Sequence, residues 1–141
     1  MTYAIGAALQ TAIYEALVTH PAIVALVGDA VFDTVPAGPR PDVYVSLGTE
    51  KVRDQSDMTG AGALHEFVVR VVADESGFAR AKGVAAAVSD ALHNADLSLS
   101  RGTLVFLNFH RGRATRARTG DARQIDMTFR ARVCDSASVT P

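Results

Sequence analysis

The stretch HEFVVRVVADESGFARAKGVAAAVSDAL, residues 65–92, decides the fold, because its hydrophobic period changes partway along. Its first part places Phe67, Val69 and Val71 on one face of the chain, and this period of two predicts a strand. Over residues 78–95, apolar side chains recur every three or four positions, which predicts a helix with one core-facing stripe. The stretch therefore predicts a strand followed by a helix that packs on a sheet.

The segments on either side of this unit predict further helices and strands. The apolar spacing near the N-terminus predicts an amphipathic helix that ends at His20-Pro21, since the residue before a proline avoids the helical region. A short helical turn follows and is closed by Gly28, a residue type common at helix C-caps. The predicted helices occupy residues 3–19 and 23–27, and the predicted strands occupy residues 43–48, 104–109 and 124–133.

The last of these strands alternates cleanly between two faces. We expect one face to point into the core, and it comprises Ile125, Met127, Phe129, Ala131 and Val133. The other face is expected to point to solvent or to a neighbouring subunit, and it comprises Asp126, Thr128, Arg130 and Arg132. The order of elements predicts one α+β domain over residues 1–141, with a roughly four-stranded, mainly antiparallel sheet and helices packed on one face.

Composition and charge exclude several classes of protein. The 141 residues suffice for one domain with its own core, and a hydrophobic fraction of 48% with 21% charged residues argues against a disordered chain. Cys134 is the only cysteine, which excludes a disulfide within the chain. No apolar run approaches the roughly 18 residues that a membrane span needs. We therefore expect a soluble protein with no membrane partner and no export signal.

Residues 49–64, TEKVRDQSDMTGAGAL, carry charges and glycines without a sustained period. They predict a long loop between two strands, mobile in the isolated chain and ordered when it assembles with partners. Lys51, Arg53 and Asp54 of this loop are candidate contact residues.

Residues 111–121, RGRATRARTGD, concentrate arginines between the last two predicted strands, so a basic hairpin is expected over residues 111–123. Its candidate contact residues are Arg111, Arg113, Arg116, Arg118 and Arg123. The hairpin has two interpretations: it grips nucleic acid, or it meets an acidic protein surface. The absence of Phe, Tyr and Trp from residues 111–123 argues against a stacking grip on single strands.

The charge is also unevenly distributed along the chain, although the formal net charge is only -1. Residues 1–100 hold six Lys and Arg against twelve Asp and Glu, whereas residues 101–141 hold eight Arg against three Asp. Such opposed portions suit head-to-tail contact between copies of one protein, and a basic portion can also mark a nucleic-acid face.

No motif points to catalysis, a metal or a cofactor. The sequence lacks a phosphate-binding loop and a nucleophile elbow. The four histidines, His20, His65, His93 and His110, do not have the spacing of metal ligands. We therefore assign no catalytic, cofactor-binding or metal-binding residue and do not expect an enzyme.

Four segments together resemble the tail-completion, or tail-terminator, proteins of long-tailed phages and of gene transfer agents. They are LQTAIYEALVTHPAIVALVGDAVFDTVPAG (9–38), PDVYVSLGTE (41–50), the strand-helix unit at 65–92, and FRARV (129–133). The resemblance implies a non-enzymatic structural protein, made in the bacterial cytoplasm, that forms a ring, typically hexameric, at the neck of the virion or virion-like particle. The ring ends the tail tube and joins it to a neck or connector protein, and DNA passes through it without sequence-specific binding.

The resemblance transfers a fold and an assembly role but no cofactor and hardly any contact residue. The basic hairpin matches no family motif. A nucleic-acid-binding module that uses this hairpin is therefore the second interpretation, and a small-molecule enzyme is the third.

Overall fold

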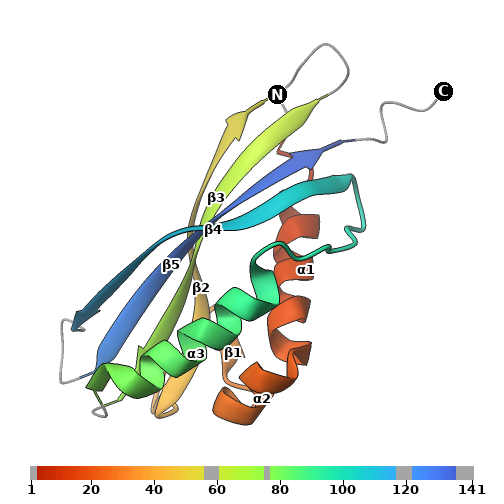
Figure 1. Ribbon diagram of the computed structural model, residues 1–141. Coiled ribbons are helices and arrows are strands. Elements are labelled where there is room, and N and C mark those ends of the chain that lie inside the picture. Colours follow the sequence, from red (N-terminus) through yellow and green to blue (C-terminus); the bar gives the residue numbers. More distant parts are fainter. Residues whose placement is uncertain (1–2, 56–60, 75–76, 117–121, 136–141) are drawn as a thin grey trace.

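The computed structural model describes residues 3–55, 61–74, 77–116 and 122–135 (Figure 1). Helix α1 (Gly6–Thr19) and helix α2 (Pro21–Val27) are separated only by His20, whose extended backbone precedes the proline. Gly28 ends α2 with a φ of 63°, in the left-handed region that glycine adopts without strain. Both predicted N-terminal helices are confirmed.

Among the described residues, no single helix is long and apolar enough to cross a membrane. By length and composition alone, the pair α1 and α2, bent by 71°, passes that test together.

Within the described residues, the rest of the chain forms one five-stranded mixed sheet and a third helix. The elements are β1 (Val31–Phe32), β2 (Val43–Asp54), β3 (Gly62–Ala73), α3 (Gly77–Leu92), β4 (Thr103–Arg116) and β5 (Arg123–Cys134). The strand order is β1-β2-β3-β5-β4, with β1 parallel to β2 and the other neighbours antiparallel. The predicted α+β class is confirmed. The fifth strand was not predicted, because β1 has only two residues and leaves no periodic signal.

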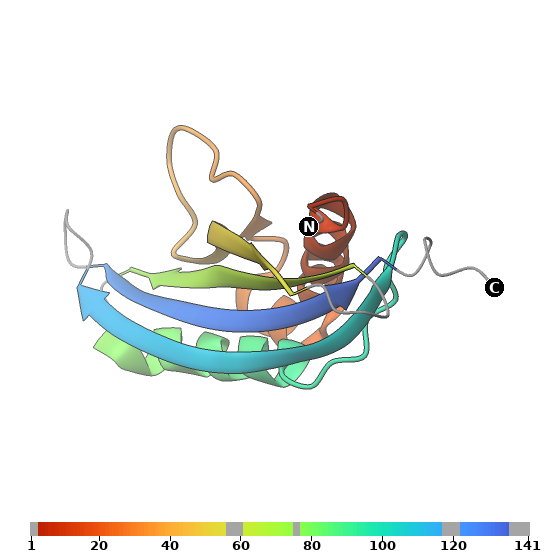
Figure 2. The same ribbon diagram turned by 90° about the horizontal axis from the view of Figure 1, so that it is seen from above.

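The helices lie together on one side of the sheet (Figure 1), and we call this side the helical face. Figure 2 shows α3 running along one side of the curved sheet, while the segment between β1 and β2 rises on the other. All five predicted core residues of β5 are buried on the helical face. The fully buried Phe129 connects three strands, since its ring centre lies 5.7 Å from the ring centres of both Phe67 and Phe109.

Helix α3 ends earlier than the predicted limit at residue 95. Its last residue is Leu92, and Asn94 takes a φ of 60°, which ends the helical path. The chain is then tied to the sheet, because the backbone N–H of Asn94 donates to the carbonyl of Leu107 at 2.7 Å.

The predicted long loop at residues 49–64 is wrong for residues 49–54 and 62–64, which are paired parts of β2 and β3. A β-bulge between Leu47 and Glu50 adds one residue to β2 and shifts its alternation. Beyond the bulge, backbone pairing with β3 holds residues 50–54 in strand form, although Val52 is the only apolar residue among them. Residues 56–60 lie outside the described part of the chain.

Candidate functional site

The sheet face opposite the helical face, which we call the open face, carries no helix within the described residues. Directly paired residues of neighbouring strands point to the same face, so the register assigns each side chain to a side. The open face gathers the basic side chains of four strands: Lys51, Arg53, Arg70, Arg111, Arg113, Arg130 and Arg132. Its carboxylates in the paired strands are Glu66 and Asp126. Cations therefore outnumber carboxylates on this face.

Both carboxylates are engaged by arginines of the same face. The Nε of Arg130 donates to Oε1 of Glu66 at 3.2 Å, and the Nε of Arg70 donates to Oδ1 of Asp126 at 2.9 Å. These are half-exposed ion pairs, so each contributes little to stability, but each fixes the direction of an arginine. The hydrogen bond from Arg130 lowers the pKa of Glu66 below its usual value. Partial burial opposes that shift, and the charges of Arg130, Arg111 and His110 add to it.

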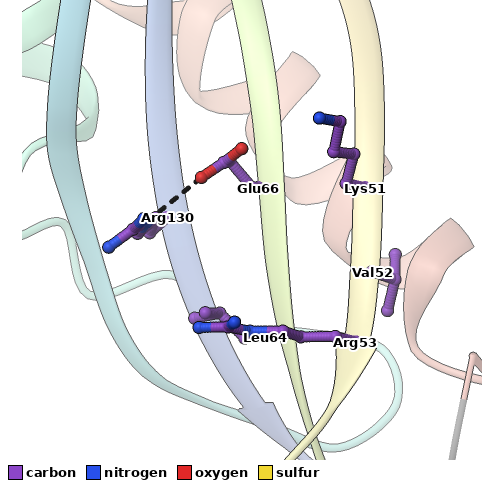
Figure 3. Close-up of a pocket in the computed structure, with 6 residues that line it drawn as sticks. All are labelled: Lys51, Val52, Arg53, Leu64, Glu66 and Arg130. Carbon is purple, nitrogen blue, oxygen red and sulfur yellow. Dashed lines mark hydrogen bonds and ion pairs between the residues drawn. The ribbon is translucent and has the colours of Figure 1, made fainter.

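A shallow hollow of about 330 Å³ lies on this face where β2, β3 and β5 run side by side (Figure 3). It is lined by Lys51, Val52, Arg53, Leu64, Glu66 and Arg130. In the close-up, Arg53 extends from β2 across β3, and Glu66 turns toward Arg130. Leu64 is buried and gives the hollow an apolar floor beneath charged walls. Such a mixture suits a protein side chain that has both a carboxylate and an apolar part.

The predicted contact residues divide between the two faces. Lys51, Arg53, Arg111 and Arg113 are on the open face. Three residues belong to the helical face by register. Of these, Asp54 pairs with Ala63, and Arg116 pairs with Arg123. The guanidinium of Arg123 lies 5.5 Å from the ring centre of Phe78 in α3.

The arginines of the basic hairpin therefore do not form one cluster, although they are close together in the sequence. β4 continues to Arg116 and β5 begins at Arg123, as a hairpin requires, but Arg111 and Arg113 lie on the open face, whereas the paired Arg116 and Arg123 lie on the helical face. Arg118 lies outside the described residues.

Sequence reasoning did not bring Arg70, Arg130 and Arg132 into this site. The alternation of β3 and β5 placed them on the polar sides of two strands, but only the register joins them to Lys51 and Arg53. The period of two in both strands showed which side chains share a face within each strand, but it did not show which strands are neighbours.

Among the described residues, no group of three His, Cys, Asp or Glu side chains is placed to hold a metal ion. His65 is fully buried on the helical face, where its Nδ1 lies 3.1 Å from Oε2 of Glu50. Glu50 also accepts a hydrogen bond from the hydroxyl of Tyr3 at 2.9 Å, and this bond raises the pKa of Tyr3. This group ties the segment before α1 to the β2–β3 pair.

Comparison with known proteins identifies the family of this chain. The model of the family described as tail completion protein gp17 matches residues 11–134. A chain of the solved structure "Virion of native gene transfer agent (GTA) particle" is 56% identical and superimposes with a TM-score of 0.89. That match covers 94% of this chain and 99% of the other. No curated protein matches. The family model covers the whole sheet and every helix except the start of α1, so this chain belongs to the tail completion protein gp17 family.

Proposed function

We propose that this protein is a non-enzymatic subunit that ends the tail tube of a phage-like particle and joins it to the neck. Membership of the tail completion family supports a structural role in the tail. The similarity to a chain of a gene transfer agent virion supports a place in the assembled particle. The working form is a homo-oligomeric ring, with six copies as the resemblance implies, in contact with a tail tube protein and a neck protein. The protein is made in the bacterial cytoplasm before it enters the particle.

The open face carries this proposal, because it is a broad, basic surface that no helix covers in the described residues; the segment between β1 and β2 borders only its Tyr44 end. A sheet face usually packs against a second layer, so an uncovered face indicates a partner. Its arginines present planar donors that bind carboxylates in pairs with good geometry. We infer that it meets an acidic protein surface of an adjacent subunit, the tube or the neck.

The chemistry of the face favours protein over nucleic acid as its main partner. Glu66 and Asp126 lie among the cations and would repel phosphates, while each already engages an arginine. The half-buried Val68 and Val72 add apolar surface within the same rows. The excess of cations also attracts phosphates, so DNA that passes through the ring feels this field without any sequence being read.

Particles that lack this protein test the proposed role directly. We expect electron micrographs of such particles to show overlong tails or tails detached from heads, with normal heads. Normal tail length and normal joining in its absence would reject the role.

Single arginine substitutions test the open face. Arg53→Ser and Arg111→Ser each remove one charge from it, and Arg80→Ser removes one from the exposed surface of α3 as a matched control. We expect the two open-face variants to join less well than the native protein at low salt, with a difference that shrinks as salt screens the contact, and the control to behave as the native protein. Undiminished joining together with loss of packaged DNA from both open-face variants would instead assign the face to nucleic acid.

A further inference from the structure

Helix α2 presents an apolar surface to solvent. Its sequence, PAIVALV, contains no polar residue, whereas a helix at a protein surface normally has a polar outer side. Ile23 and Val27 point into the core, but Val24 and Leu26 are each 45% exposed. A compact group of exposed aliphatic side chains of this kind marks a contact with another molecule.

A second apolar surface lies on the helical face, between α3 and β4. Helix α3 packs mainly on β3 and β5, and beside it an open groove of about 370 Å³ remains. Its walls and floor are mostly small or apolar, and they include Ala85, Ala86, Phe109, Ala114 and Met127. Lys82 stands on the α3 wall.

Near Phe109, the groove can accept the side chains of a partner, but a strand of a partner cannot pair with the edge of β4 there. There the outer edge of β4 is already bonded, because the backbone N–H of Phe109 donates to Nδ1 of His93 at 3.0 Å. The carbonyl of Leu107 likewise accepts from the N–H of Asn94. Docking by strand addition needs such groups unbonded, whereas a helix that inserts apolar side chains does not.

The charges around the two surfaces are complementary. Residues 1–39 contain no Lys or Arg, and two exposed carboxylates lie after α2: Asp29 two residues beyond its end, and Asp33 directly after β1. The groove carries Lys82, and Arg116 continues the β4 wall on the same face, two residues beyond Ala114. One chain therefore holds an apolar helix with an acidic flank and an apolar groove with a basic flank.

We propose that α2 of one copy docks in the α3–β4 groove of the next copy. Two different patches that match each other generate a head-to-tail contact, and such contacts close into a ring when the rotation per copy allows it. The contact rests on the proposed ring and specifies which surfaces form it. The outer side of α2, with Ala25 at its centre and Val24 and Leu26 on its two flanks, lies in the groove, while Asp29 or Asp33 approaches Lys82 and Arg116.

Cysteine crosslinking in assembled particles tests this contact. The background is Cys134→Ser, which removes the natural thiol, and the exposed positions are Ala25→Cys in α2 and Ala86→Cys in the groove. Under mild oxidation, particles that carry both cysteines should yield a ladder of covalent multimers up to the closed ring. Particles that carry either cysteine alone should yield none.

The outcomes separate this inference from the proposed function. Normal particles with the protein at the tail end, but without a ladder from the double-cysteine variant, would overturn the docking contact and leave the proposed function intact. A covalent dimer from Ala25→Cys alone would overturn it as well, because α2 would then meet α2. Absence of the protein from the tail end would reject the proposed function itself.

A charge exchange gives an independent reading without cysteines. Asp29→Lys and Lys82→Glu should each weaken self-association of the purified protein about tenfold, as measured by sedimentation, while thermal unfolding shows that both variants fold. The double variant should recover most of the loss if these residues face each other across the contact. If Asp33 faces Lys82 instead, the recovery should appear with Asp33→Lys. Recovery with neither would overturn the assignment of the flanks.

Discussion

Replacing Phe129 by alanine should be among the most destabilising single changes in the core. The side chain is fully buried, and its ring contacts the rings of Phe67 and Phe109. Truncation of a buried phenylalanine to alanine costs about 3 to 5 kcal/mol, as lost burial and as the cavity left behind. The two ring contacts together account for about 1 to 3 kcal/mol. This contribution is already included in the 3 to 5 kcal/mol and is not added to it, because the ring contacts are lost with the same atoms. We expect a loss of about 4 kcal/mol, a large share of the roughly 5 to 15 kcal/mol that stabilises a domain.

Urea denaturation measures this loss directly. With a slope of about 2 kcal/mol per molar, typical of small proteins, the midpoint should fall by about 2 M. The measurement needs protein concentrations at which the chain is monomeric, because assembly adds its own stability.

Phe109→Ala is the matched control. Phe109 makes the other half of one ring contact but is 39% exposed, so its truncation should cost only about 1 kcal/mol. Equal midpoint shifts for the two variants would refute the reasoning, because burial of Phe129 is the only large difference between them. A shift below about 1 kcal/mol for Phe129→Ala would also contradict its place in the core.

Other changes test the charges and the backbone. Folding lowers the pKa of Glu66 below its usual value near 4.5. Its carboxylate therefore stabilises the fold at pH values above about 4.5, and this stabilisation is lost as the pH falls through the lower pKa of the folded state. The stability difference between the native protein and Glu66→Gln should therefore shrink on acidification below that value. Gly102→Ala should cost about 2 kcal/mol or more in urea denaturation, because φ is 76° and a Cβ would lie 2.5 Å from Ile5. Gly83→Ala, in open space on α3, should instead add about 0.5 to 1 kcal/mol, and equal effects of the two glycine changes would contradict this account.

The sequence predicted those elements whose apolar period is unbroken. The strand and helix at residues 65–92 and the core-facing side of β5 could be assigned because each side chain repeats its neighbour's environment at a fixed interval. The end of α3 was placed too late, since the apolar residues Ala95 and Leu97 continue the pattern although the backbone turns at Asn94.

The candidate site was only partly predictable. Lys51, Arg53, Arg111 and Arg113 were selected by type and local density, without knowledge of which side they face. Their joining with Arg70, Arg130 and Arg132 depends on strand order and register, which set contacts between residues far apart in the chain. Bulges in β2 and β4 break the alternation from which a face could be read. The hairpin arginines were grouped as one cluster for the same reason.

The bulge in β2 also determines which changes of length the β2–β3 arm can tolerate. Loss of either Gly48 or Thr49 would remove the bulge and leave every later pair of the ladder intact, so Lys51 and Arg53 would stay on the open face and Glu50 on the helical face. The bulge thus holds a spare residue within the strand, and one residue can be lost there without a change in any later pair. Relatives that keep the basic side of this arm should therefore tolerate the loss of one residue at Gly48–Thr49 more readily than at residues 50–54.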